Sequence, residues 1–253
     1  MAEMKTLAKD TAIYGVSSIL GKFLNWCLVP FYTYILTSSA EYGMVTGLYA
    51  LTAVLLVLLT YGMETGFFRF ANKAENDPNV VYSTSLVCLT FSSLLFILVC
   101  TLFLPSISSL MGYENHPEFI WMMAVIVAID AFSAIPFAYL RFKKRPIAFA
   151  VLKLVMIFTN IFFNLFFLWI CPKIHEWNPD IISWFYDPTY GVGYVFVANF
   201  ISSVIGLLVL IPFFVHVKWL YDRVLLKQML RYSLPLVVLG ITGIMNQSFD
   251  KMM

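Results

Sequence analysis

The chain has little charge. Only 12% of its 253 residues are Asp, Glu, Lys or Arg, whereas 61% are hydrophobic. Soluble domains usually carry about 25% charged residues, so this composition argues against a soluble globular protein. The apolar residues also lie in runs of roughly 20, the length that a helix needs to cross a bilayer. The sequence therefore predicts an all-α, polytopic bundle of transmembrane helices.

Residues that build metal, redox and nucleotide sites are scarce. The four cysteines form no CxxC motif and lie in or beside apolar runs, so we interpret them as packing residues. The three histidines lie near the ends of different runs and form no ligand pair. A phosphate-binding GxxxxGK[ST] motif is absent, because Phe23 follows Gly21-Lys22. The sequence calls for no cofactor, no metal and no nucleic-acid partner.

Seven apolar runs are predicted to be membrane-spanning helices. They cover Thr11 to Leu36, Gly43 to Phe67, Val80 to Leu104, Pro117 to Leu140, Ile147 to Cys171 and Gly191 to Val215, with a seventh beginning near Tyr232. The first run contains Lys22 and has no small-residue cleavage pattern, so it is interpreted as a retained helix rather than a signal peptide. We expect residues 1–231 to form a six-helix lobe and residues 232–253 to be the truncated start of a second lobe.

Positive charges alternate between successive loops. Twelve Lys and Arg residues lie before the first run or after the even-numbered runs, whereas only Lys173 follows an odd-numbered run. Because cationic loops stay in the cytoplasm, this pattern predicts a cytoplasmic N-terminus. The loop from Pro172 to Tyr190 is predicted to anchor the outer membrane surface through the amphipathic rings of Trp177, Trp184, Tyr186 and Tyr190, with substrate contact as the alternative.

Polar side chains on the first predicted helix share one stripe. Ser18, Lys22 and Asn25 lie within an arc of roughly 100°, which also contains Tyr32. A lysine in the middle of a span is costly unless it faces protein, water or a partner charge. We therefore predict that Ser18, Lys22 and Asn25 bind substrate.

The fifth predicted helix repeats this arrangement. Lys153, Asn160 and Asn164 are seven and four residues apart, which places them on one face. We predict that they bind substrate too. Lys153 could instead extend to the cytoplasmic interface, and the two asparagines could instead form hydrogen bonds between helices.

Acidic residues inside the spans must be neutralised or paired. Asp130 in the fourth run and Asp250 in the seventh are predicted to have coupling or charge-pairing roles, and Asp130 could pair with Lys22 or Lys153. Glu64, with Arg69 just beyond it, is interpreted as part of an interfacial ion pair.

The second run contains two motifs of small residues. Gly43-x-x-x-Gly47 and Gly62-x-x-x-Gly66 leave the backbone accessible, which favours close helix contact. In the first run, Pro30 follows the polar stripe and predicts a kink, since its nitrogen cannot donate a helical hydrogen bond. The glycine motifs are interpreted as packing signals, and the bent first helix either lines a cavity that operates by alternating access or has a static kink.

Short motifs in a fixed order resemble one family. They are Leu36-Thr-Ser-Ser-Ala-Glu-Tyr-Gly43 after the first helix, Gly62 through Phe70, Tyr139-Leu140-Arg141, and Leu234-Pro235 followed by Asp250-Lys251. In order and spacing they resemble the N-terminal lobe of a polysaccharide biosynthesis flippase of the multidrug, oligosaccharidyl-lipid and polysaccharide exporter superfamily.

The resemblance implies two six-helix lobes around a central cavity that operates by alternating access. It implies a polyprenyl-diphosphate-linked oligosaccharide as substrate, moved from the inner to the outer leaflet of a bacterial inner membrane for cell-surface polysaccharide export, with polysaccharide assembly proteins as partners. Lys22 would attract the diphosphate. The polar faces of the first and fifth helices would suit sugar hydroxyls.

Two other functions compete with this interpretation. A drug or toxin exporter of the same superfamily would have acidic residues dominating its cavity, whereas Asp130 is the only deep acid in the first six runs, beside the cations Lys22 and Lys153. A membrane enzyme acting on lipid-linked sugars would need a large outer loop with catalytic side chains. The longest outer loop here covers only residues 172–190, so we expect no enzyme.

Overall fold

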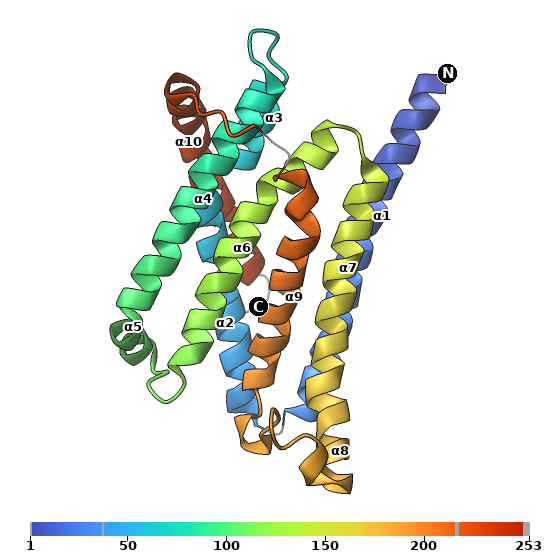
Figure 1. Cartoon of the computed structure of the whole chain (residues 1–253), viewed down its shortest axis with the longest axis vertical. Coiled ribbons are helices and arrows are strands. Elements are labelled where there is room, and N and C mark those ends of the chain that lie inside the picture. The colour runs from blue at the N-terminus through green and yellow to red at the C-terminus, as the bar shows by residue number, and fades with distance from the viewer. Residues whose placement is uncertain (1, 37, 216–217, 250–253) are drawn as a thin grey trace. The chain divides into compact units, whose positions relative to one another are not determined.

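The protein is a bundle of α-helices. A computed structural model describes residues 2–36, 38–215 and 218–249, and within these ranges it does not describe the side chains of residues 2–10, 18, 22, 25, 39 and 244–249. The described part of the chain contains helices and no strand (Figure 1). Seven of its helical segments are long and apolar enough to cross a membrane. The predicted fold class is confirmed.

Seven long helices carry the fold. They are α1 Ala2–Ile35, α2 Ser39–Thr60, α4 Pro78–Leu102, α6 Pro117–Phe142, α7 Pro146–Leu165, α9 Gly193–Leu210 and α10 Arg223–Phe249. The shorter elements are α3 Met63–Ala71, α5 Leu104–Met111, α8 Cys171–Trp177, the π-helix η1 Phe166–Ile170, and the 3₁₀ helices η2 Pro179–Ile181, η3 Pro188–Tyr190 and η4 Ile211–Phe213. All seven predicted runs correspond to helices.

The second predicted run is broken. Tyr61 and Gly62 adopt left-handed backbone angles, with φ of 35° and 67°, so α2 ends at Thr60 and α3 begins at Met63. A Cβ added at Gly62 would lie 2.8 Å from the backbone oxygen of Ser233 in α10. Glycine is therefore needed here both for its backbone angle and for the close approach of α10.

The seventh helix begins nine residues before the predicted start. The Asp222 carboxylate accepts hydrogen bonds from the backbone N–H groups of Val224 and Leu225, at 2.8 and 3.0 Å, and so caps α10 at Arg223. The predicted start near Tyr232 is wrong, because the first turns of α10 are charged and lie outside the apolar run.

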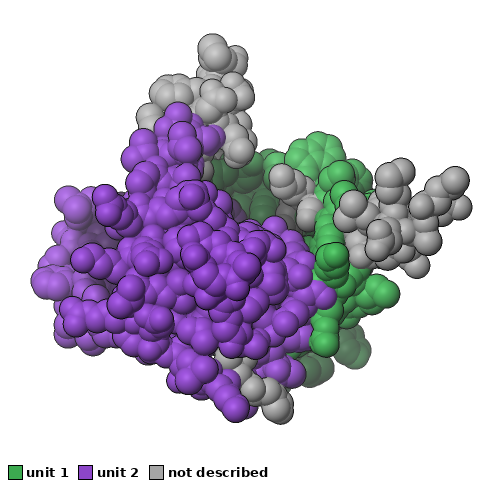
Figure 2. All heavy atoms as spheres, turned by 90° about the horizontal axis from the view of Figure 1, so that it is seen from above, with its two compact units in different colours: residues 1–48, 144–209 green, residues 49–143, 210–253 purple. Residues whose placement is uncertain are grey.

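The chain forms two compact units. Unit 1 contains residues 1–48 and 144–209, and unit 2 contains residues 49–143 and 210–253 (Figure 2). In unit 1, α1 packs along α7. A Cβ at Gly21 of α1 would lie 2.7 Å from Ile157 Cδ1 of α7, so the absence of a side chain permits this packing. The edge of the Tyr14 ring meets Phe149, with centroids 5.2 Å apart.

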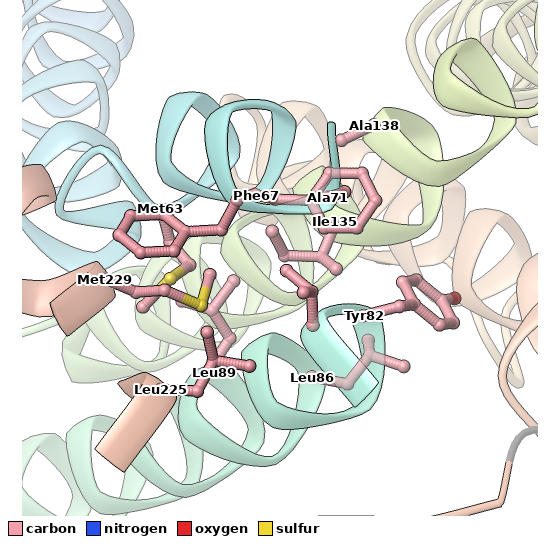
Figure 3. Packing of buried hydrophobic residues seen from close by; sticks show 12 residues of the cluster. Met63, Phe67, Ala71, Tyr82, Leu86, Leu89, Ile135, Ala138, Leu225 and Met229 are labelled. Atoms are coloured by element: carbon pink, nitrogen blue, oxygen red, sulfur yellow. The ribbon is translucent and has the colours of Figure 1, made fainter. Parts of the chain in front are cut away.

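Unit 2 has an apolar core between α3, α4, α6 and α10. Met63 and Phe67 of α3 meet Leu86 of α4, Ile135 of α6 and Met229 of α10 (Figure 3). The outward side chains of α4 are apolar as well and largely exposed. They are Phe91, Leu94, Leu95, Leu98 and Leu102. An apolar core behind an apolar exterior is expected for helices surrounded by lipid.

The two glycine motifs differ in their contacts. A Cβ added at Gly66 would lie 2.3 Å from Ser233 Oγ, so the pair Gly62 and Gly66 does permit close helix packing, as predicted. A Cβ at Gly43 or Gly47 would meet no described atom within 4 Å. The packing role predicted for that first pair is wrong within the described part of the chain.

The ion pair of Glu64 has a different partner from the one predicted. The Arg141 guanidinium donates from Nη2 to Glu64 Oε1, which joins the end of α6 to α3. Arg69 instead lies over the ring of Tyr232, with Cζ 4.1 Å from its centroid. Residues 64 and 69 are close in sequence, but the packing of α6 against α3 brings Arg141 to the carboxylate.

The loop after the fifth span folds into short helices. Trp177 and Trp184 are largely exposed, as an interfacial anchor requires. Tyr186, in contrast, is buried and stacks on Tyr194 with ring centroids 5.0 Å apart. Its predicted role as an interfacial ring is wrong, because it packs against α9.

Candidate functional site

Unit 1 contains a chain of polar side chains within its apolar helices. The Tyr32 hydroxyl of α1 donates to Asn164 Oδ1 of α7 at 2.8 Å. Asn164 Nδ2 donates to Asn160 Oδ1, also at 2.8 Å, and Asn160 Nδ2 donates to Asn199 Oδ1 of α9 at 2.6 Å. One hydrogen-bonded relay therefore connects α1, α7 and α9.

Asn164 is the buried centre of this relay. Its side chain is 0% exposed and Tyr32 is 6% exposed. Its Oδ1 accepts from Tyr32, while Nδ2 donates to both the backbone oxygen and Oδ1 of Asn160. An amide buried without partners would be costly in an apolar interior. Asn164 therefore holds α1 against α7, which agrees with the interhelical hydrogen bonds considered from the sequence.

The other end of the relay is more open. Asn160 and Asn199 are both half-buried, and Asn199 Nδ2 donates to the backbone oxygen of Val195 at 2.8 Å. Ser202 Oγ donates to the backbone oxygen of Met156 at 2.8 Å and ties α9 to α7 a second time. Amides both donate and accept hydrogen bonds, so Asn160 and Asn199 have the chemistry to bind neutral hydroxyl groups.

Only part of the predicted site lies among the described side chains. Ser18, Lys22 and Asn25 belong to α1, but the structure does not describe their side chains. Asp250 lies outside the described residues. Lys153 is half-buried on α7, seven residues before Asn160. The structure brings Asn160 and Asn164 together, as predicted. Asp130 is half-buried on α6, which belongs to unit 2.

Sequence reasoning missed Asn199. It is the only asparagine in the sixth predicted run, residues 191–215, just as Asn160 and Asn164 stand out in the fifth. The same rule, that a polar residue within a span needs a partner, would have selected it. Tyr32 was included in the polar stripe of the first helix, but no sequence pattern identified Asn164 as its partner.

Two titratable groups of the loop after α8, Tyr186 and Asp187, have shifted pKa values. Burial, with smaller contributions from Tyr194, Cys171 and Asp187, raises the pKa of Tyr186 to about 12. The Thr189 hydroxyl and backbone N–H lower the pKa of the Asp187 carboxyl by hydrogen bonding. Among the described residues, no group of three or more His, Cys, Asp or Glu side chains could hold a metal ion.

The chain is similar to one known protein family and to one solved structure. A family model described as "Polysaccharide biosynthesis protein" matches residues 35–172, more than half of the chain. The outward-facing conformation of a multidrug resistance MATE family transporter of the MOP superfamily matches with a TM-score of 0.62 and 15% identity, over 94% of this chain and 52% of that chain. The chain thus spans about half the length of that structure. No curated protein matches.

Proposed function

The chain belongs to the polysaccharide biosynthesis protein family, and we propose that it forms the first lobe of a flippase for a polyprenyl-diphosphate-linked oligosaccharide. The family match and the transporter fold agree with the flippase resemblance of the sequence motifs. Both favour a membrane exporter over an enzyme. Transfer from the inner to the outer leaflet by alternating access is the finer part of the proposal.

The family match over residues 35–172 is the observation that carries this proposal. This range includes Asn160 and Asn164, and Asn160 joins Asn199 at the more open end of the relay. Amide groups suit the hydroxyls of an oligosaccharide. Lys22 and Lys153 add positive charge within the predicted spans, which favours an anionic head group such as a diphosphate over a cationic drug.

Orientation and lobe structure are further parts of the proposal. The chain spans about half of the matched transporter, which supports residues 1–231 as one six-helix lobe and the last helix as the start of another. The concentration of Lys and Arg residues before the first span and after the even-numbered spans supports a cytoplasmic N-terminus. We place the protein in a bacterial inner membrane, beside polysaccharide assembly proteins.

A deletion of the full-length gene tests the flippase function. We expect the lipid-linked oligosaccharide on the outer leaflet to fall and the same molecule to accumulate inside, as measured by its accessibility to a membrane-impermeant labelling reagent. Complementation with the wild-type gene should restore the outer signal. Unchanged exposure in the deletion strain would contradict the proposal.

Lys22→Ala tests the proposed diphosphate contact. We expect outer exposure to fall about tenfold, since hydrogen bonds to charged groups contribute roughly 1.5–3 kcal/mol. Lys22→Arg keeps the charge and is the matched control, which should retain most of the activity. Normal export by the alanine variant, at equal amounts of protein in the membrane, would remove Lys22 from the site.

A drug exporter is the second candidate, because the matched structure is a multidrug resistance transporter. This function predicts that the deletion strain becomes sensitive to cationic drugs while its lipid-linked oligosaccharide stays normally exposed. The two functions therefore give opposite results in the same strain.

A further inference from the structure

One end of unit 2 carries an excess of positive charge. The starts of α4 and α10 and the ends of α3 and α6 meet at this end (Figure 1). Its described basic side chains are Arg69, Lys73, Arg141, Lys143, Lys218, Arg223, Lys227 and Arg231. Its described acids are Glu64, Glu75, Asp77 and Asp222.

The acids at this end are already engaged. Glu64 binds Arg141, and Glu75 accepts from Lys73 Nζ at 3.0 Å. Asp77 caps α4, and Asp222 caps α10. Within the described residues, no ion pair joins a carboxylate to Arg223, Lys227 or Arg231. These three cations can therefore pair with an anion from outside the chain.

The segment that carries these cations is held in place by α4. We call residues 218–231 the cationic strap. Three successive α4 side chains make half-buried hydrogen bonds here, one to Phe213 of η4, which precedes the strap in sequence, and two to the backbone of the strap itself. These bonds are Tyr82 Oη to Phe213 O at 2.8 Å, Leu220 N to Ser83 Oγ at 2.7 Å and Asp222 N to Thr84 Oγ1 at 3.3 Å. A ligand would meet a preorganised surface.

The strap carries both exposed cations and exposed aromatic rings. Arg223, Lys227 and Arg231 are four residues apart along α10, which places them on one face, and all are exposed. Trp219 and Tyr221 are 52% and 55% exposed. The combination of basic side chains with amphipathic rings is typical of segments at the boundary between headgroups and hydrocarbon.

We propose that the cationic strap binds the headgroups of anionic phospholipids. The candidate membrane span of the last helix begins at Arg223, so the cationic face lies on the first turns of that helix, from which long Lys and Arg side chains reach toward lipid headgroups. Arg223, Lys227 and Arg231 bind the phosphate, while Trp219 and Tyr221 lie in the interface beside it. This site is independent of the oligosaccharide substrate, so its failure would leave the proposed function untouched.

Lipid binding by the purified full-length protein tests this proposal. Native mass spectrometry in a neutral detergent measures the retention of phosphatidylglycerol and of phosphatidylcholine. We expect Arg223→Gln/Lys227→Gln/Arg231→Gln to weaken phosphatidylglycerol binding on the order of 100-fold, from about fivefold per cation, and to leave phosphatidylcholine binding unchanged. Lys227→Gln alone should lose about fivefold, which keeps the test valid if the triple variant does not fold.

A second triple variant distinguishes a specific lipid site from a general attraction of anionic lipids to positive charge. Lys143→Gln/Lys144→Gln/Arg145→Gln removes the same charge from the exposed segment between α6 and α7, which lies outside the strap although Lys143 belongs to the same cationic end. We expect this control to retain at least a tenfold advantage in phosphatidylglycerol binding over the strap variant. Equal losses in both triple variants, or wild-type binding by the strap variant, would overturn the site.

Discussion

The amide side chain of Asn164 is buried between apolar helices of the kind that lipid surrounds. Its desolvation is offset by hydrogen bonds to Tyr32 and Asn160, and these bonds also fix which faces of α1 and α7 meet. The spacing of Asn160 and Asn164 was sufficient to predict that they share a face. The partner of Asn164 was not predictable, because Tyr32 lies 132 residues away and one sequence contains no record of that pairing.

Tyr32→Phe tests this bond with the smallest change. The variant removes the hydroxyl that donates to Asn164 Oδ1 and keeps the buried ring. We expect the free energy of unfolding in detergent to fall by about 1 kcal/mol, within the range of hydrogen bonds between membrane helices.

Tyr34→Phe is the matched control for that measurement. Tyr34 lies two residues further along α1 and is 90% exposed, so loss of its hydroxyl should change stability by no more than about 0.5 kcal/mol. Equal stabilities of the two variants would show that the hydroxyl of Tyr32 contributes nothing beyond its ring.

The break between α2 and α3 interrupts one continuous apolar run. Run length and hydropathy predicted the span, since both are local properties, but they contain no signal for a turn at Tyr61 and Gly62. The break follows from tertiary packing, because α10 approaches the backbone of Gly62 and Gly66 through Ser233. Similarly, the charged first turns of α10 fall outside the apolar run, although Asp222 in the sequence is an ordinary N-cap signal.

Gly62→Ala should be strongly destabilising. The new methyl group would meet the Ser233 backbone oxygen at 2.8 Å, at a residue whose φ is +67°. We expect a loss of about 2 kcal/mol or more from left-handed strain and steric overlap together, measured by thermal unfolding in detergent.

Substitutions at two other glycines distinguish the effect of left-handed strain from that of steric overlap. Gly112 has φ of +75° and no described atom within 4 Å of an added Cβ, so Gly112→Ala should show the strain alone, about 1–2 kcal/mol. Gly43 lies in α2 with open space around it, so Gly43→Ala should be neutral or stabilising by up to about 1 kcal/mol. A Gly62→Ala protein as stable as Gly112→Ala would contradict the close approach of α10.

For the whole molecule, hydrophobicity made the fold class and the seven spans predictable. In lipid, each spanning segment must satisfy its backbone hydrogen bonds by itself, so spans can be recognised one at a time. The division into two compact units follows from contacts between distant segments and was not predicted. The six-helix lobe of residues 1–231, the substrate roles of Lys22 and Lys153 and the coupling or charge-pairing role of Asp130 remain predictions.

Transport by the purified full-length protein in liposomes tests the central claim most directly. A fluorescent polyprenyl-diphosphate-linked oligosaccharide is placed in both leaflets, and the fraction that a membrane-impermeant quencher can reach is followed over time. A flippase should make the inner pool accessible at a rate far above that of protein-free liposomes. Movement of a cationic drug by the same preparation, with the inner oligosaccharide pool still protected, would contradict the account.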